Sequence, residues 1–225
     1  MKKLLLIALV FTTVSASAQG VKLNAYTNYI FMDQVDSYYG DQSYFDGQIK
    51  GGFQWGAGLQ YNISPLTGIE LTYHRQDTKA DGSYRAQNGA IKRNEFDVAL
   101  NWIMLNGVRE YKKPGGKFEA FGGMGLGMCI IDTKNQANGK SENATKFAWQ
   151  VRGGGNVWVS EKVGIKLTAQ LQSAVQSMGG GFFIGTGGVS AGVSSFSSLM
   201  QFGLGTGLVF KLGGTSPAPA PMRAR

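Results

Sequence analysis

The sequence predicts an all-β protein: an eight-stranded antiparallel transmembrane β-barrel with up-and-down meander topology. Three observations predict it. Eight segments of roughly 9–11 residues alternate apolar side chains with small or polar ones, as strands with two different faces do. The connections between these segments alternate between long and short. The first residues have the organisation of an export signal.

The export signal is predicted over residues 1–18. Lys2 and Lys3 form a short basic region, residues 4–14 are mostly apolar, and Ala16-Ser17-Ala18 fits a small-x-small cleavage pattern. The apolar run is too short to span a bilayer as a helix. Loss of Lys2 and Lys3 would lower the net charge from +8 to +6. We therefore expect an exported mature chain, with the barrel over residues 19–212.

The first four strands follow the signal in chain order. The clearest runs over residues 51–62, where Phe53, Trp55, Leu59 and Tyr61 share one face and glutamines, glycines and Asn62 share the other. In a membrane barrel the apolar face meets lipid and the small, polar face lines the lumen. The four predicted strands, each with its lipid-facing residues, are 21–32 (Val21, Leu23, Ala25, Tyr29, Phe31), 51–62 (Phe53, Trp55, Ala57, Leu59, Tyr61), 68–76 (Ile69, Leu71, Tyr73) and 94–105 (Phe96, Val98, Leu100, Trp102, Met104).

The last four strands show the same alternation. Glycines and polar residues oppose the apolar positions in each of them, so the same orientation is predicted. They are 117–131 (Phe118, Ala120, Met124, Leu126, Met128, Ile130), 146–158 (Phe147, Trp149, Val151, Val157), 163–172 (Val163, Ile165, Leu167, Ala169, Leu171) and 199–212 (Phe202, Leu204, Leu208, Phe210, Leu212).

The lengths of the connections predict which end of the barrel faces the periplasm. Outer-membrane barrels pair long extracellular loops with short periplasmic turns. The first connection is long, which predicts that both mature termini lie in the periplasm. The long connections are 33–50, 77–93, 132–145 and 173–198, and the shorter ones are 63–67, 106–116 and 159–162.

Aromatic residues on the predicted lipid-facing side fall into two bands, one near each end of the strands. Such bands are typical of the aromatic girdles at the two membrane interfaces. The residues predicted for this lipid-facing aromatic girdle are Phe53, Trp55, Tyr61, Tyr73, Phe96, Trp102, Phe118, Phe147, Trp149, Phe202 and Phe210.

The signal, the eight alternating segments, the loop phase and the glycine-rich last strand, Gly203 to Phe210, together resemble one family. It is the family of small outer-membrane β-barrels of Gram-negative bacteria, of the outer membrane protein A and X types ("porin family"). The resemblance implies the fold and an outer-membrane location, and it says little about activity. The chain departs from the usual pattern because Phe210 is followed by Lys211, Leu212 and a Pro-rich tail, residues 213–225, which we expect in the periplasm.

The predicted lumen face carries charged side chains, which must pair or contact water. An eight-stranded barrel is about filled by its own side chains, which favours a paired internal network that plugs the lumen. A narrow path for ions or small solutes is the alternative. The residues predicted for this lumen charge network are Glu70, His74, Glu95, Asp97, Glu119, Arg152, Lys166 and Lys211.

No catalytic residue, cofactor or metal site is predicted. His74 is the only histidine and faces the lumen in this pattern, and the single cysteine, Cys129, excludes an intrachain disulfide. A lipid-modifying enzyme is a further alternative that the sequence does not favour. The sequence predicts a non-enzymatic barrel with a structural or loop-presenting role in the cell envelope. Its expected partners are outer-membrane lipid, lipopolysaccharide and a protein bound through loops 33–50, 77–93, 132–145 or 173–198, and not nucleic acid.

Overall fold

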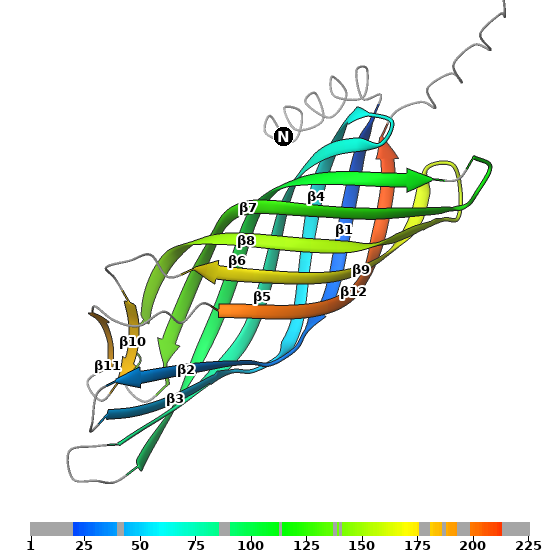
Figure 1. Cartoon of the computed structure of the whole chain (residues 1–225). Coiled ribbons are helices and arrows are strands. Elements are labelled where there is room, and N and C mark those ends of the chain that lie inside the picture. Colours follow the sequence, from blue (N-terminus) through cyan, green and yellow to red (C-terminus); the bar gives the residue numbers. More distant parts are fainter. Residues whose placement is uncertain are drawn as a thin grey trace, which may run out of the picture.

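Eight strands close into an antiparallel barrel in the computed structural model of the chain (Figure 1). Each barrel strand pairs with the next one along the chain, and the first pairs with the last to close the ring. The predicted fold class and meander order are therefore confirmed. The barrel strands are β1 (Val21–Ile30), β4 (Gly52–Ser64), β5 (Thr67–Arg85), β6 (Ile91–Lys112), β7 (Phe118–Asn135), β8 (Ser141–Trp158), β9 (Val163–Val175) and β12 (Leu199–Leu212).

The structure describes residues 20–39, 43–85, 91–112, 114–136, 139, 141–175, 181–185, 188–192 and 199–212. The predicted signal peptide, 1–18, and the predicted tail, 213–225, lie outside these residues. Within the described ranges, no helix is long and apolar enough to cross a membrane. The barrel has a short-turn end, where residues 65–66, 114–117 and 159–162 lie between strands, and an opposite end that we call the loop end.

Much of the sequence predicted as long loops is β-structure. Strand β5 continues to Arg85 and β6 begins at Ile91, so their hairpin extends past the predicted strand ends. Two further hairpins are present, β2 (Asp33–Tyr39) with β3 (Ser43–Ile49), and β10 (Gly181–Gly185) with β11 (Gly188–Gly192). Paired strands satisfy their own backbone hydrogen bonds, so they need not end at a membrane surface.

The β2–β3 hairpin widens the sheet at the loop end. Strand β5 pairs with β4 from Thr67 to Gln76. Further along the chain, from Ala80 opposite Ile49 to Tyr84 opposite Phe45, β5 pairs with β3. Figure 1 shows this hairpin running beside the extended ends of β5 and β6. The barrel therefore continues into an open sheet on one side of its loop end.

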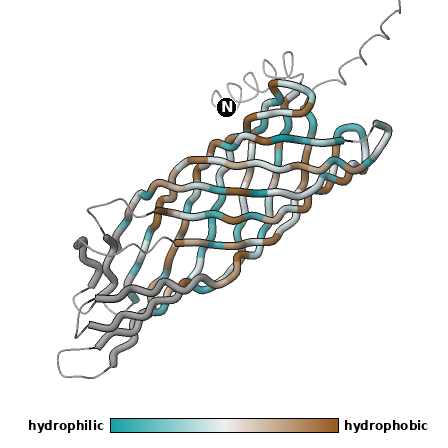
Figure 2. The backbone as a smooth tube through the Cα atoms, viewed as in Figure 1, coloured by the Kyte–Doolittle hydropathy of each residue, from teal (hydrophilic) through white to brown (hydrophobic). Residues whose placement is uncertain are grey.

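Side chains alternate between the two faces of the barrel wall as predicted on seven strands. On β4, Phe53 and Trp55 are 59% and 47% exposed on the outside, whereas Gln54 and Gln60 are buried inside. Figure 2 shows the alternation of apolar and polar residues along the strands. The same outward pattern holds for apolar residues of β1, β5, β7, β8, β9 and β12, among them Leu23, Tyr29, Ile69, Leu71, Phe118, Leu126, Phe147, Val151, Ile165, Leu167, Phe202 and Leu204.

Strand β6 has the opposite orientation to the one predicted. Phe96 and Trp102 are fully buried inside the barrel, so they do not belong to a lipid-facing girdle. Glu95 and Asp97 are not in the lumen network: Glu95 is half-buried among charged side chains at the loop end, and Asp97 is exposed on the outer face. The register places Trp102 opposite His74, which also faces inward.

The orientation of β6 differs from the prediction because a narrow barrel needs apolar side chains in its interior as well as on its outer surface. Strand β6 carries apolar residues on both faces, because Ile103 and Leu105 are exposed on the outside while Leu100 and Met104 are buried inside. Hydrophobicity alone therefore does not decide which face of this strand meets lipid.

Inward-facing glycines make room for polar side chains of neighbouring strands. A Cβ atom at Gly58 would collide with the carboxylate of Glu70, and one at Gly125 would collide with the carboxamide of Asn106. Gly205 similarly leaves space for Asn28. The glycines thus allow large polar side chains to lie across the barrel interior.

Candidate functional site

Three layers of side chains fill the described part of the barrel interior. Inward residues change in character along every long strand from the short-turn end to the loop end. On β5 they run from Glu70 through His74 and Gln76 to Ala80, and on β9 from Lys166 to Ala174. The interior is therefore ordered into an ionic layer, an amide layer and an apolar plug, which are described in turn.

The ionic layer begins at the short-turn end around Lys22. Its ammonium group lies 2.7 Å from the carboxylate of Glu110 and 3.0 Å from that of Glu119. Asn156 Nδ2 donates to Glu119 at 2.8 Å, and Gln60 Nε2 donates to Glu110 at 2.9 Å. These side chains come from five strands and are buried, so they tie the wall together across the lumen.

The ionic layer continues around Glu70. Arg152 forms an ion pair with Glu70 although the two residues lie 82 positions apart in the sequence. Tyr26 Oη donates to the same carboxylate at 2.5 Å, and Asn24 Nδ2 donates at 2.8 Å. The ammonium group of Lys166 lies 4.0 Å from the ring centre of Phe121. A buried carboxylate with these donors is fully compensated and has little freedom to move.

The amide layer lies above the ionic layer, toward the loop end. Gln54 Oε1 accepts from Gln170 Nε2 at 2.7 Å and from Asn28 Nδ2 at 3.2 Å. Gln172 Nε2 donates to Gln201 Oε1 at 3.1 Å. These groups are neutral, so the layer offers hydrogen bonds without net charge. Its members, all buried, are Asn28, Gln54, His74, Gln76, Gln150, Gln170, Gln172 and Gln201.

The apolar plug closes the interior toward the loop end. It is one cluster of buried side chains, and strand β6 supplies the largest of them. An apolar cluster is an unfavourable environment for ions. The plug consists of Ala80, Phe96, Val98, Leu100, Trp102, Met104, Cys129, Ala148, Ala174 and Leu199.

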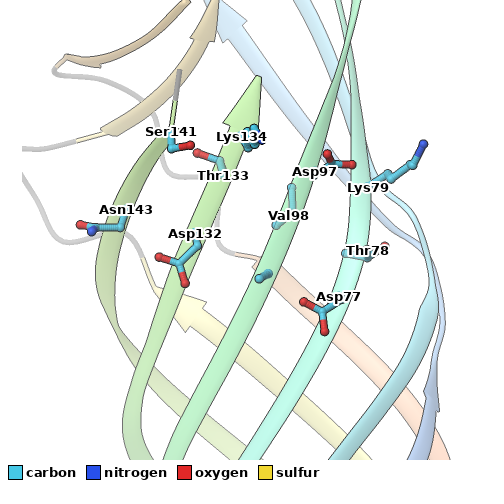
Figure 3. A pocket seen from close by; sticks show the side chains of 11 residues that line it. Asp77, Thr78, Lys79, Asp97, Val98, Asp132, Thr133, Lys134, Ser141 and Asn143 are labelled. Carbon is cyan, nitrogen blue, oxygen red and sulfur yellow. The ribbon is translucent and has the colours of Figure 1, made fainter. Parts of the chain in front are cut away.

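A polar hollow lies on the outer face of the extended strands β5 to β8. Its volume is about 820 Å³, and Figure 3 shows the aspartates and lysines that line it. Strand register arranges the outward residues in two parallel rows, and one row alternates in charge. The rows are Asp77–Ala99–Asp132–Asn143 and Lys79–Asp97–Lys134–Ser141.

Ion pairs beside the hollow join β5 and β6 to each other and to Lys50, in the segment before β4. Lys50 Nζ lies 2.9 Å from Asp81 and 3.3 Å from Glu95, and Lys79 lies 3.5 Å from Glu95. The hydrogen bond to Asp81 raises the pKa of the Lys50 ammonium group, so Lys50 stays charged at neutral pH. Exposed pairs of this kind contribute little to stability and mainly shape the surface charge.

The structure brings together part of the predicted charge network. Glu70 and Arg152 contact each other directly, and Glu119 binds Lys22. Lys211 lies with its ammonium group 3.8 Å from the ring centre of Trp158. His74 is buried inside, edge-on to the ring of Tyr26.

Glu110 is a central interior residue that the predicted network lacked. It was missed because residues 106–116 were assigned to a connection, whereas β6 continues to Lys112. The sequence contained an indication of this position, because Glu110 lies an even number of residues from Phe96 and Trp102 and so faces the same side of the strand. A longer strand with these residues facing lipid would have put a carboxylate in lipid, which argues for the opposite orientation.

The remaining girdle residues lie on the outside. Phe53, Trp55, Tyr61, Phe118, Phe147 and Phe202 are exposed there, and Tyr73, Trp149 and Phe210 are half-buried. Rings of Trp55 and Tyr73 contact each other, as do those of Phe31 and Phe202. Their location at membrane interfaces stays a prediction.

Metal chemistry finds no support in the described ranges. No group of three or more His, Cys, Asp or Glu side chains there could hold a metal ion. The single histidine and the single cysteine both lie inside the barrel, separated from the polar hollow by the wall.

Comparisons with known proteins agree with this architecture. No protein-family model and no curated protein matches the sequence. The structure is similar to that of Neisserial surface protein A, with a TM-score of 0.55 and 14% identity over 86% of this chain and 97% of that chain. It is also similar to the outer membrane protein OprG from Pseudomonas aeruginosa, with a TM-score of 0.53 and 10% identity over 84% of this chain and 95% of that chain. At these identities the likeness shows the fold, which is that of the small outer-membrane barrels named from the sequence.

Proposed function

We propose that the protein is a non-enzymatic barrel of the Gram-negative outer membrane with a closed lumen, which presents its extended sheet to a partner outside the membrane. The observation that carries this proposal is the filled interior. An ionic layer, an amide layer and an apolar plug follow one another along the interior, and β5 to β8 continue beyond the plug.

The outer surface supports membrane insertion. Large apolar side chains such as Leu59, Leu71, Leu126 and Leu204 are about half exposed around the wall, which would be costly in water over so wide an area. Outer-membrane lipid and lipopolysaccharide are the expected neighbours of this surface. In this arrangement the short-turn end and both mature termini face the periplasm, and the extended sheet lies outside.

The interior disfavours catalysis at the one histidine. His74 is fully buried and surrounded by the barrel wall, so a lipid substrate outside has no contact with its ring. The polar hollow, by contrast, is open and carries both signs of charge. Alternating charges favour a specific, oriented partner more than they favour tight binding of a simple ion.

A closed lumen predicts that the refolded wild-type barrel does not conduct ions across a planar bilayer. The plug presents apolar side chains where a pore would need polar ones. Folding and insertion are checked by strand content and by protection from added protease. Reproducible discrete openings in wild-type protein would contradict the closed lumen and favour the narrow-channel alternative.

A loop-presenting role predicts site-specific cross-linking in intact cells. A photoreactive amino acid at Asn143, in the hollow, is expected to give one discrete protein adduct, and replacing Asp97 and Asp132 by alanine is expected to abolish it. The matched control is Leu126 on the neighbouring strand, which faces lipid and is 61% exposed. The same adduct from both positions, or no adduct from Asn143, would contradict the role proposed for the hollow.

A further inference from the structure

Buried polar side-chain atoms without a protein partner occur in both polar layers, and many of them lie in the amide layer and at its border with the apolar plug. Both ring nitrogens of His74 and both side-chain polar atoms of Gln76 lack one, as does Nε1 of Trp102. All three side chains are completely buried. In the same layer, single atoms of Asn28, Gln54, Gln150 and Gln201 also lack a protein partner.

These atoms lie close together because of the strand register. His74 is directly opposite Trp102, and Gln76 is directly opposite Leu100. Gln54 is opposite Gln76 on the other side. These unpartnered atoms therefore lie where the amide layer meets the apolar plug, to which Trp102 and Leu100 belong.

Leaving so many buried polar atoms without hydrogen bonds is energetically implausible. Each unsatisfied group costs about 1–3 kcal/mol, and folded proteins almost always satisfy such groups. The set includes donors, such as the Trp102 indole N–H, and acceptors, such as Gln76 Oε1. Buried water, which typically makes about three hydrogen bonds, can serve both kinds at once.

We propose that the amide layer is a chamber that binds ordered water, and that the apolar plug seals this chamber toward the loop end. The water bridges His74, Gln76 and Trp102 and completes their hydrogen bonds. The plug supplies almost no polar atoms to continue the chain of water, because it is made largely of aliphatic and aromatic side chains. The barrier to ions is therefore the plug, and not the ion pairs nearer the short-turn end.

The first test measures water at one atom. In protein labelled with ¹⁵N-tryptophan, the indole N–H of Trp102 is expected to show a rotating-frame Overhauser cross-peak to water with the sign of a long-lived contact. The variant Trp102→Phe assigns the resonance. In methyl-labelled protein the methyl group of Ala80, a plug residue that the register places opposite Phe96, is expected to show no such cross-peak and serves as the dry control. A folded wild-type protein without a water cross-peak at Trp102 would overturn the chamber.

The second test measures the seal. The double variant Phe96→Ser, Leu100→Ser is expected to give discrete openings in a planar bilayer, because hydroxyl groups let water continue through the plug. The control is Ile103→Ser, Leu105→Ser, which changes the outward face of the same strand and is expected to stay silent.

A double plug variant that is folded, inserted and silent would overturn the seal. The water measurement on wild-type protein does not depend on any variant folding. The water measurement is also independent of the proposed function. If the wild-type protein conducted ions, the proposal of a closed lumen would fail, but the water contact at Trp102 would still be expected.

Discussion

Replacing Glu70 by alanine is expected to lower the free energy of unfolding by about 3–5 kcal/mol. Glu70 is buried, and its carboxylate accepts from Arg152, Tyr26 and Asn24 at one point in the lumen. Its removal leaves the Arg152 guanidinium buried without its counter-charge, near the ammonium group of Lys166. The measurement is equilibrium unfolding by urea in lipid vesicles.

Two controls make the Glu70 result interpretable. The double variant Glu70→Ala, Arg152→Met removes both charges and is expected to recover a large part of the loss, because no unpaired charge remains. Asp77→Ala breaks an exposed ion pair with Arg75 and is expected to cost about 0–1 kcal/mol. A Glu70→Ala variant no less stable than Asp77→Ala would contradict a buried, compensated pair.

Replacing Trp102 by alanine is expected to cost about 3–5 kcal/mol, since it empties a large volume within the apolar plug. Trp102 is completely buried and is among the largest side chains in that cluster. Trp55→Ala is the matched control, because Trp55 is outward-facing and 47% exposed. Its loss removes surface contacts without leaving a cavity, so a smaller effect is expected by the same unfolding measurement.

The comparison of the two tryptophans also tests the orientation of strand β6. If Trp102 faced lipid, as the hydrophobic pattern alone suggests, the two substitutions would have similar effects. A loss at Trp55 equal to or larger than that at Trp102 would therefore contradict the buried position of Trp102.

The alternation of side chains was sufficient to predict the wall of the barrel. On β4, large apolar residues alternate with glycine and glutamine over the whole strand, and only one face could be the outer one. On β6, both faces carry large apolar side chains, so the pattern left the orientation open. Pairing with β5 decides it, because Trp102 must face the same side as His74, its partner in the register.

The extension of the strands was less predictable. Beyond the membrane both faces of a strand meet water, so the alternation that identifies a strand disappears. Residues 77–85 continue β5 through their pairing with β6 and β3, which depends on long-range register and not on local composition. The polar hollow depends on that extension and was not foreseen.

The sequence by itself determined the fold class, the number of barrel strands, their order and the face of seven of them, because strand periodicity and loop spacing are local properties. Only the tertiary structure decided which charges meet. Glu70 and Arg152 lie on β5 and β8, and Lys22 meets Glu110 because closure of the ring brings β1 and β6 across one narrow lumen. It also decided the orientation of β6, since a narrow barrel needs apolar side chains inside as well as outside.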